Sequence, residues 1–428
     1  MNGYSLRVTS KTPIIFLSAA EASGDRHGAA LVRALRRRVP EARILGTAGP
    51  LMTAAGCEVV ADLTAQASMV GGPFLKLGYW FRTVKRLASA VRDVKPDVLV
   101  PIDSPALNWH LCKAGKSAGA SVMYYIAPQV WAWAPWRIRK IRRLTDTVAC
   151  LLPFEETYFR QRGVNARFVG HPLFDVERGE GVSPAPHDDG PPDLLHAWGE
   201  GQWRIAVVPG SRPGEVAAHI MPLLTVMRSL AKRWPKAQFT LAVHNDGVAD
   251  ILRDACRKAK VDLDETPPSM DQANGTHSAD ETSALRLVVG QTPRVLATSH
   301  FGLIKSGTVT LEAAAAGLPM VIFYKTGPIM AALYRALRRF RWAIPTPYLS
   351  LVNILAGQEL VTELMPWRGG PSHLEAVAVE AMSDLGHLHE LREDLLALVA
   401  PLQPRNNQNA ADRAADMVLE LLRTRQGG

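Results

Sequence analysis

The sequence predicts an α/β protein of two domains, each built on a parallel sheet that helices cover on both faces. Short apolar strands alternate with amphipathic helical segments from residue 13 to residue 174, and the same alternation starts again at residue 204. Repeated strand–helix units favour parallel strands, because each helix carries the chain back to the same end of the sheet. The 428 residues also exceed the roughly 250 to 300 that one hydrophobic core normally organises.

The composition limits the classes of function. The chain is 47% hydrophobic and 21% charged, which is typical of a globular protein. Its 49 Lys+Arg against 40 Asp+Glu give a formal net charge of +9, which favours an anionic partner such as a phosphate-bearing ligand, a nucleic acid or an anionic lipid surface. No apolar run reaches the roughly 18 residues that span a bilayer, so any membrane association is expected to be peripheral. The four cysteines are scattered and predict reduced core thiols in a cytoplasm.

The chain begins its first domain with a strand and a glycine turn. Residues 13–20 are predicted as a buried strand rather than a signal sequence, because the apolar run is short and leads directly into the turn at residues 21–25. A helix follows, so Ser23, Gly24 and Asp25 at its start are candidate contacts for a polar or anionic ligand. An ordinary structural turn is the alternative.

Further strands lead to the stretch that carries the chemistry of this domain. Asp103 follows one of them, and the open edge beyond parallel strands is where α/β sheets bind ligands. A Trp-rich loop at residues 127–136 contains Gln129, and its indoles either shape a pocket or pack. The basic segment 137–143 is a candidate anion contact or a solvated helix face. The predicted strands here are residues 42–46, 97–102, 121–126 and 147–152.

Two segments combine aromatic and apolar side chains with lysine and arginine. They are residues 72–92 and 328–342. A basic amphipathic segment can lie on an anionic membrane, with its cations at the head groups and its rings at the acyl boundary. An ordinary helix that packs its apolar face on a sheet is the alternative. Two such segments in one basic chain favour a role at a membrane surface.

The second domain is predicted to begin after a linker. Residues 175–200 are rich in Gly, Pro and Asp and have little periodicity, which indicates an interdomain linker before a domain at residues 201–395. A strand at 204–208 leads into a loop with Ser211 and Arg212 and then a helix. This loop suits a phosphate, because its backbone can approach closely and arginine supplies a forked charged donor. A plain turn is the alternative.

A second candidate anion site lies further along this domain. Ser306, Gly307 and Thr308 start a helix whose unpaired N–H groups suit a diphosphate. Glu312, one turn later, can accept hydrogen bonds from vicinal hydroxyls such as those of a ribose. A capped structural helix with a solvent-facing glutamate is the alternative. Residues 267–291 before this site are predicted to form a polar insertion loop.

Nine sequence blocks, in order, cover most of the chain. They are SAAEASGDRHG (18–28), PIDSPALN (101–108), YYIAPQVWAWAPWRIRKI (124–141), LLPFE (151–155), FVGHPL (168–173), VVPGSRPGEV (207–216), SGTVTLE (306–312), PMVIFYK (319–325) and SLVNILAGQELV (350–361). Together they resemble the bacterial lipid-A-disaccharide synthase family. One block would be weak, whereas nine in register are specific.

The resemblance implies a GT-B glycosyltransferase, in which two Rossmann-like domains face each other with their parallel sheets across a cleft. It implies an inverting reaction that joins UDP-2,3-diacylglucosamine to 2,3-diacylglucosamine 1-phosphate (lipid X), giving the β-1,6-linked lipid A disaccharide and UDP. The acceptor is expected on residues 1–174 and the UDP-sugar on the second domain. The C-terminal helices, residues 396–428, are expected to pack back on the first domain.

The resemblance also implies the partners and the site residues. Asp103 matches the aspartate proposed as the general base, Arg212 and the helix start at Ser306 would stabilise the departing UDP, and Glu312 would hold the ribose. We expect no cofactor, no metal and no nucleic acid. The enzyme is expected to be cytoplasmic and to bind peripherally to the anionic inner leaflet. A homo-oligomer is compatible with the family. Weaker candidates for substrate contacts are Gln129, His171 and Asn353.

Three residues depart from the family pattern, and two other functions compete. Ala20 stands where glycine is frequent, Ala106 where a second acidic residue is frequent, and Lys305 where a small residue is usual. Another GT-B UDP-sugar enzyme, such as a MurG-like transferase or a UDP-N-acetylglucosamine epimerase, would share the second-half site but not the first-half blocks. A non-catalytic lipid- or nucleotide-binding protein would be expected to lack the base or the diphosphate arginine.

Overall fold

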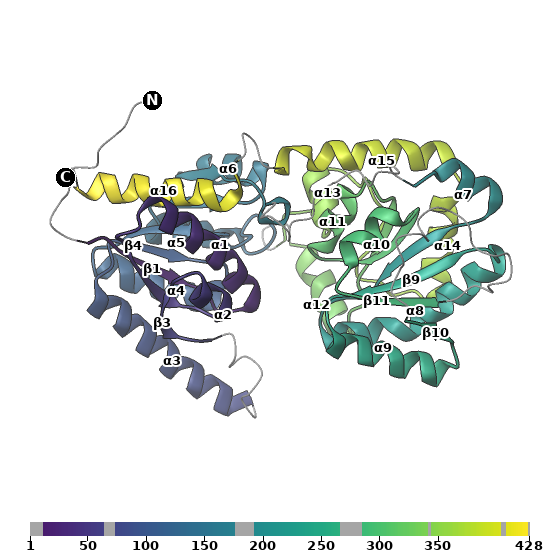
Figure 1. The fold of residues 1–428 in the computed structure, drawn as a ribbon, viewed down its shortest axis with the longest axis horizontal. Helices are drawn as coiled ribbons and strands as arrows, with labels where there is room; N and C mark the ends of the chain where they lie inside the picture. The colour runs from purple at the N-terminus through teal and green to yellow at the C-terminus, as the bar shows by residue number, and fades with distance from the viewer. Residues whose placement is uncertain are drawn as a thin grey trace. The chain divides into compact units, whose positions relative to one another are not determined.

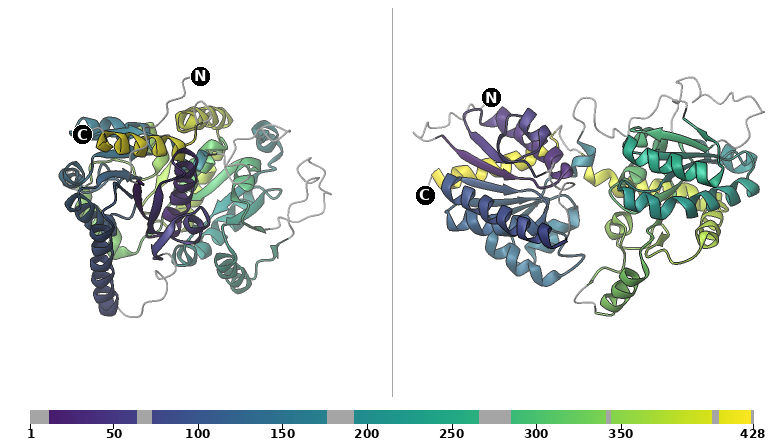
Figure 2. Two further views of the ribbon diagram at one scale, coloured as in Figure 1. Left: turned by 60° about the vertical axis from the view of Figure 1, so that its left-hand side comes forward. Right: turned by 90° about the horizontal axis from the view of Figure 1, so that it is seen from below.

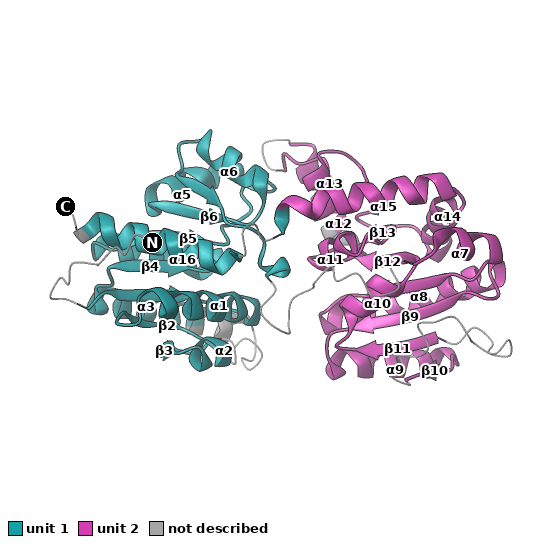
Figure 3. Cartoon of the chain, turned by 45° about the horizontal axis from the view of Figure 1, so that its top comes forward, with its two compact units in different colours: residues 1–181, 402–428 teal, residues 182–401 magenta. Residues whose placement is uncertain are grey.

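The structure is a computed structural model that describes residues 12–63, 73–175, 192–265, 285–340, 344–403 and 408–426. The chain forms two compact units (Figure 3), one of Met1–Gly181 with Leu402–Gly428 and the other of Val182–Pro401. Each unit contains one seven-stranded sheet whose strand pairs are parallel. The predicted α/β class with two parallel sheets is therefore confirmed, and the cleft expected across them stays a prediction.

The sheet of the first unit has the order β3-β2-β1-β4-β5-β6-β7. Figure 1 labels its strands β1, β3 and β4. β1 pairs with β2 on one side and β4 on the other, so the strand order reverses between β1 and β4. This reversal is the switch point at which open α/β sheets bind ligands. The strands are β1 (Ile14–Ser18), β2 (Arg43–Thr47), β3 (Glu58–Ala61), β4 (Val98–Pro101), β5 (Ser121–Tyr125), β6 (Thr147–Cys150) and β7 (Ala166–Phe168).

Helices cover both faces of this sheet, as expected for parallel strands. Apolar residues of α1, α2 and α16 form the core on one face, and those of α3, α4, α5 and α6 form the core on the other. α16 packs along α1 (Figure 2), where Arg38 contacts Asp412 at 2.7 Å and Asp416 at 2.7 Å. The helices are α1 (Ala22–Arg38), α2 (Pro50–Ala54), α3 (Pro73–Val94), α4 (Pro105–Ser117), η1 (Pro135–Arg137), α5 (Ile138–Leu144), α6 (Pro153–Arg160), η2 (Pro172–Phe174) and α16 (Ala410–Gln426).

The sheet of the second unit has the order β10-β11-β9-β8-β12-β13-β14, with its switch point between β8 and β12. Its strands are β8 (Arg204–Val208), β9 (Gln238–Val243), β10 (Leu263–Asp264), β11 (Leu285–Val289), β12 (Phe301–Lys305), β13 (Met320–Phe323) and β14 (Glu363–Leu364). Its helices are α7 (Leu194–Glu200), α8 (Pro213–Arg233), α9 (Asp246–Ala259), α10 (Thr292–Thr298), α11 (Val309–Ala315), α12 (Pro328–Arg338), α13 (Leu351–Ala356), α14 (Pro371–Met382), α15 (Leu385–Val399) and η4 (Ala400–Leu402).

One predicted loop is in part a strand. Of residues 267–291, the stretch up to 284 lies outside the described residues, but Leu285–Val289 forms β11 and pairs with β9. The loop prediction was wrong there, because a polar flanking sequence obscured a run of only five residues.

The boundaries between the units are also defined more closely. Of the predicted linker, residues 176–191 lie outside the described residues, and α7 belongs to the second unit. The chain returns to the first unit at Leu402. Within the part of the chain that the structure describes, no helix has the length and apolar character to cross a membrane.

Candidate active site

Asp103 lies just beyond β4, at the switch-point edge of the first unit. Asp103 and Ser104 have φ angles of 47° and 42°, in the left-handed region that residues other than glycine rarely adopt. Each such residue costs on the order of 1–3 kcal/mol, and it persists only where the surrounding structure holds it. Ser104 then caps α4, so two strained residues carry the chain from strand to helix and leave Asp103 at the edge.

Buried polar side chains hold this turn in place. Asn108 is fully buried and donates from Nδ2 to the carbonyl oxygens of Ile102 at 3.1 Å and Asp103 at 2.7 Å. Its Oδ1 accepts a hydrogen bond from the hydroxyl of Ser18 at 2.7 Å. The hydroxyl of Tyr124 donates to the same carbonyl of Asp103 at 2.8 Å. Groups from β1, β5 and α4 therefore fix the backbone of Asp103, a role that the sequence did not reveal for Asn108 or Tyr124.

The electrostatic surroundings of Asp103 favour a base. Burial raises the pKa of its carboxyl group, and repulsion from Glu21 raises it further, while the backbone N–H of Ser104 acts in the opposite direction. A carboxylate with a raised pKa binds a proton more readily than an ordinary surface aspartate. Perturbed groups at a sheet's binding edge are typical of catalytic sites.

The three candidate residues at the start of α1 differ in their exposure and in their contacts. Ser23 is exposed in the first turn, and Gly24 is buried, with an added Cβ lying 3.4 Å from the Cβ of Ala19. Asp25 is buried and accepts three backbone N–H bonds at the start of α2. The structure therefore assigns Asp25 the structural role, which was the alternative for this turn. Its donors are Gly49 at 2.8 Å, Leu51 at 2.9 Å and Met52 at 3.1 Å.

The Trp-rich loop is anchored by packing. Trp131 is buried, and its Nε1 donates to Oε1 of Glu155 at 2.8 Å. The ring of Trp131 meets that of Phe154 edge-on, with 4.9 Å between centroids. Trp131 therefore packs within the unit, which was one of the two roles predicted for the indoles of this loop. Trp133 and Trp136 are exposed.

Two weaker candidates lie near the same sheet edge. Gln129 is exposed in the loop after β5, so its side chain is accessible to a ligand. His171 is buried, and its Nδ1 accepts a hydrogen bond from the backbone N–H of Leu173 at 3.2 Å. Burial, with a smaller contribution from His27, lowers the pKa of His171 to about 4. His171 is therefore neutral at physiological pH and is held by its own turn.

In the second unit, the loop between β8 and α8 presents an arginine. Gly210 has a φ of 134°, which residues with a side chain rarely adopt, and Ser211 after it is exposed. Arg212 stands at the N-cap position of α8 with 76% of its side chain exposed, and its Nη1 lies 3.3 Å from Oε1 of Glu215. Glu215 is largely buried, whereas the guanidinium group of Arg212 is exposed and therefore available to a ligand.

Lys305, at the end of β12, adds a second cation to this edge. Its Nζ lies 3.0 Å from Oε1 of Glu215, and the two side chains are only 12% and 11% exposed. Lys305 also lies close to both glycines of the neighbouring loops. A Cβ atom added to Gly307 would lie 3.9 Å from Nζ of Lys305, and one added to Gly210 would lie 3.7 Å from its Cδ. Burial raises the pKa of Glu215, but Lys305 and then Arg212 outweigh it and hold that pKa below its usual value. The departure from the family pattern at Lys305 therefore places an ammonium group beside both glycine loops.

The second glycine loop leads from β12 into α11. The backbone N–H of Ser306 donates to the carbonyl of Phe323 at 2.9 Å, which ties the loop to β13. Thr310 donates from Oγ1 to the carbonyl of Gly307 at 2.7 Å. Thr308 is exposed at the N-cap, and Glu312 is half-buried in the first turn. The four residues predicted here therefore lie together, on the same sheet edge as Arg212.

A buried histidine connects the neighbouring loops. One ring nitrogen of His219, Nδ1, lies 2.7 Å from the carbonyl oxygen of Pro209, and the other, Nε2, accepts from the backbone N–H of Lys325 at 3.1 Å. Since Nε2 accepts, Nδ1 carries the proton and donates to Pro209. His219 therefore fixes the loop after β8 to the chain after β13, a role that the sequence pattern did not indicate.

Asn353 has a structural role. It is fully buried, and its Nδ2 donates to the carbonyl of Val361 at 2.8 Å and to Oε2 of Glu363 at 3.1 Å. Its Oδ1 accepts from the backbone N–H groups of Leu360 and Val361, both at 2.9 Å. All donors and acceptors of this amide are thus used to hold residues 350–363 together, so the structure does not present it as a direct substrate contact.

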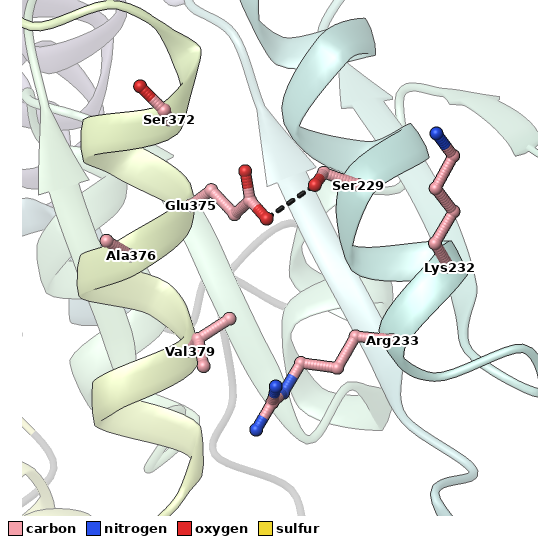
Figure 4. A pocket seen from close by; sticks show the side chains of 7 residues that line it. All are labelled: Ser229, Lys232, Arg233, Ser372, Glu375, Ala376 and Val379. Atoms are coloured by element: carbon pink, nitrogen blue, oxygen red, sulfur yellow. Dashed lines mark hydrogen bonds between the residues drawn. The ribbon is translucent and has the colours of Figure 1, made fainter.

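One depression in the second unit lies away from this edge. It has a volume of about 540 Å³ and lies between α8 and α14, where Ser229 donates a hydrogen bond to Glu375 (Figure 4). Because α8 runs back across the sheet, its C-terminal half lies far from the strand ends that carry Arg212 and Lys305. The depression therefore does not belong to the candidate site.

Two solved structures share this fold along almost the whole chain. The structure of a putative UDP-N-acetylglucosamine 2-epimerase from Listeria monocytogenes has a TM-score of 0.56, with 97% of each chain covered at 12% sequence identity. The glycotransferase of kitacinnamycin has a TM-score of 0.54, with 96% of this chain and 100% of that chain covered at 14% identity. The two parallel sheets and these likenesses place the chain in the GT-B fold class, as predicted.

The sequence identifies the family within that class. The chain belongs to the lipid-A-disaccharide synthetase family, whose model matches residues 15–418. It is 33% identical over 414 residues to the lipid-A-disaccharide synthase of Syntrophus aciditrophicus (strain SB), covering 96% of this chain and 98% of that protein. It is 34% identical over 411 residues to the lipid-A-disaccharide synthase of Klebsiella pneumoniae subsp. pneumoniae, and the match covers 95% of this chain and 97% of that protein. The family predicted from the nine sequence blocks is confirmed.

Proposed function

We propose that this chain is an inverting glycosyltransferase that makes the lipid A disaccharide. It joins UDP-2,3-diacylglucosamine to 2,3-diacylglucosamine 1-phosphate (lipid X) through a β-1,6 linkage and releases UDP. The observation that carries this proposal is the family match over residues 15–418, in a chain that retains Asp103, Arg212 and Glu312. The first unit binds the acceptor, and the second binds the nucleotide sugar.

In this reaction Asp103 acts as the general base. The 6-hydroxyl oxygen of the acceptor attacks the anomeric carbon of the donor, the bond from that carbon to UDP breaks, and the hydroxyl proton passes to the Asp103 carboxylate. The raised pKa of Asp103 supports this role, because a base accepts a proton most effectively when its pKa approaches the working pH. The rigid, strained turn supports it too, since proton transfer requires a fixed geometry.

Cations and backbone donors of the second unit stabilise the departing UDP. Arg212 and Lys305 supply two positive charges, and the loop supplies the backbone N–H groups of Gly307 and Thr308 at the start of α11. Negative charge that grows on the diphosphate as the sugar leaves is stabilised by such preorganised groups. Glu312, in the first turn of α11, binds the ribose hydroxyls.

The acylated substrates require an enzyme at a membrane surface. Where the structure describes the side chains of residues 72–92 and 328–342, each segment exposes an aromatic ring beside arginines: Phe81 is 61% exposed and Phe340 50% exposed. Exposed rings next to basic residues favour peripheral binding to the anionic inner leaflet at the cytoplasmic face. Co-sedimentation with phosphatidylglycerol vesicles tests this part of the proposal, and a homo-oligomer stays a prediction.

The assay of the reaction supplies both substrates to purified protein and measures UDP. We expect UDP release from UDP-2,3-diacylglucosamine only when lipid X is present, with one disaccharide formed for each UDP. Both substrates should be supplied with a range of acyl-chain lengths, because the sequence does not specify which chain length the enzyme prefers. Absence of UDP release with every substrate pair, or epimerisation of UDP-N-acetylglucosamine instead, would contradict the proposed function.

A further inference from the structure

A basic cavity adjoins the turn that carries Asp103 in the first unit. It has a volume of about 910 Å³ and lies between the start of α4 and the helices η1 and α5. Pro105 and Ala106 form the wall nearest the catalytic edge. Pro105 is two residues from Asp103, so their Cα atoms are at most about 7 Å apart. The wall that Pro105 forms therefore adjoins the backbone that carries the proposed base.

Five cations contribute to the lining of this cavity. They are Arg137, Arg139, Lys140, Arg142 and Arg143. Among the described residues that line it, there is no carboxylate to neutralise them. Partial burial lowers the pKa of Lys140, and repulsion from Arg137 and Arg143 lowers it further, as expected where like charges are crowded together. Such a cluster gains stability when an anion enters.

Two of the cations that line the cavity lie against tryptophan rings. The ammonium group of Lys140 lies 5.0 Å from the ring centroid of Trp109, which is only 8% exposed. Arg137 lies in the same way 5.1 Å from the ring of Trp133. Stacking on rings holds cations in fixed positions, unlike the mobile side chains of a solvated helix face. The start of α4 adds the positive end of its helix dipole on the opposite wall.

We propose that this cavity binds the phosphate monoester of the acceptor lipid. The inference rests on the proposed function for the identity of that acceptor. In 2,3-diacylglucosamine 1-phosphate the carbon that bears the phosphate and the carbon that bears the 6-hydroxymethyl group both bond to the ring oxygen. A phosphate held in the cavity therefore keeps the attacking hydroxyl on the side of the sugar that faces the adjoining turn of Asp103. Guanidinium and ammonium groups are the donors that bind a phosphate monoester most strongly. A concave site suits one head group, whereas a flat basic face would suit a lipid surface.

The first test compares two acceptors that differ only in the phosphate. Initial rates are measured with lipid X and with 2,3-diacylglucosamine for the natural protein and for Lys140→Gln/Arg143→Gln. A control, Arg162→Gln/Arg423→Gln, removes two exposed cations of the same unit outside the cavity. We expect the cavity variant to raise the KM for lipid X by about 100-fold, roughly tenfold for each cation, and to leave the KM for the unphosphorylated acceptor unchanged. The control variant should have the KM of the natural protein for both acceptors.

The second test measures binding without turnover. Glucosamine 1-phosphate, which has no acyl chains, is titrated into the natural protein and the cavity variant by calorimetry, and we expect about 100-fold weaker binding to the variant. If the natural protein makes no disaccharide yet binds this ligand through the cavity, the proposed function fails and the site stands. If both proteins form disaccharide equally well from lipid X, the site fails and the function stands.

A membrane contact is the outcome that would replace the proposal. The same variant is tested on vesicles of phosphatidylglycerol and of phosphatidylcholine. An equal loss of activity with both acceptors, together with lost binding to phosphatidylglycerol vesicles, would show that the cations bind a lipid surface, and it would overturn the phosphate site. A lost preference for the phosphorylated acceptor, with vesicle binding retained, supports the site.

Discussion

The two units fix their functional groups at strand ends in different ways. In the first unit one carboxylate, Asp103, stands on a left-handed backbone that the buried side chains of Asn108 and Tyr124 hold. In the second unit, glycine loops leave room beside two cations, Arg212 and Lys305. A base requires one group in a fixed position with a raised pKa, whereas a diphosphate requires several donors that it can approach closely. The comparison therefore supports the proposal that the first unit carries out proton transfer and the second stabilises the leaving group.

Removal of the base should have the largest effect. Asp103→Asn keeps the size and the hydrogen-bonding backbone of the residue but cannot accept the proton. We expect kcat to fall by about 10²- to 10⁴-fold, the usual contribution of a general base. The rate of disaccharide formation is the measurement, and Asp93→Asn on α3 is a control of the same chemistry away from the edge. Turnover of Asp103→Asn equal to that of the natural protein would remove Asp103 from the mechanism.

Loss of the amide that holds the turn should be next in size. Asn108→Ala removes the amide donor to the carbonyls of Ile102 and Asp103, of which the second keeps Tyr124, and the acceptor of the Ser18 hydroxyl. We expect a loss of about 1–3 kcal/mol of folding free energy. A displaced base lowers kcat by about 100-fold. Thermal unfolding and turnover are both measured at a temperature where the variant is folded.

The matched control for this change is in the other unit. Asn353→Ala also removes a buried amide with four hydrogen bonds, so a similar loss of stability is expected. Its effect on kcat should be far smaller, because Asn353 does not hold the base. Equal losses of kcat in the two variants would mean that Asn108 acts only through stability.

Lys305 should contribute a smaller, donor-specific effect. Lys305→Met removes a charged contact to the diphosphate, and we expect the KM for the UDP-sugar to rise by about tenfold. The same change removes the nearer and more buried of the two cations that contact the largely buried Glu215, which destabilises the fold. The double variant Lys305→Met/Glu215→Gln should recover stability but not donor affinity. If the double variant regains the natural KM, Lys305 serves only to neutralise Glu215.

The smallest predicted effect is a shift in the pH profile. Because the pKa of Asp103 is raised, kcat/KM should decline on the acid side at a pH above the usual aspartate range, as the base becomes protonated. Glu21→Gln removes a repulsion that raises this pKa, so the acid limb should move to lower pH. Glu41→Gln, exposed elsewhere on the same unit, is the control. A limb that stays in place for Glu21→Gln would show that another group limits the rate.

Much of this architecture could be predicted from the sequence because it depends on local patterns. The strand 204–208 was predicted with the bounds of β8, since buried parallel strands are continuous apolar runs between turns. The places of Asp103 and Arg212 after strand ends followed in the same way. Short strands such as β10 and β14, of two residues each, carry too little pattern to be recognised.

The roles of polar residues were harder to predict, because they depend on contacts between distant segments. Asp25 and Asn353 are in blocks shared with the family, but only the folded chain shows that their polar groups are used within the protein. The contribution of Asn108 depends on Ser18, which is 90 residues away in the sequence. Lys305 stood out as a departure, and its partner Glu215 became visible only in the structure.

The division of work between the units is tested most directly by one paired measurement. The dissociation constant of UDP and the kcat for disaccharide formation are determined for Asp103→Asn and Arg212→Ala. The account predicts that Asp103→Asn loses turnover with its UDP affinity unchanged, whereas Arg212→Ala loses about 10²- to 10³-fold in kcat and also binds UDP more weakly. A loss of UDP affinity in Asp103→Asn as large as that in Arg212→Ala would contradict the assignment of the base to the first unit and the diphosphate to the second.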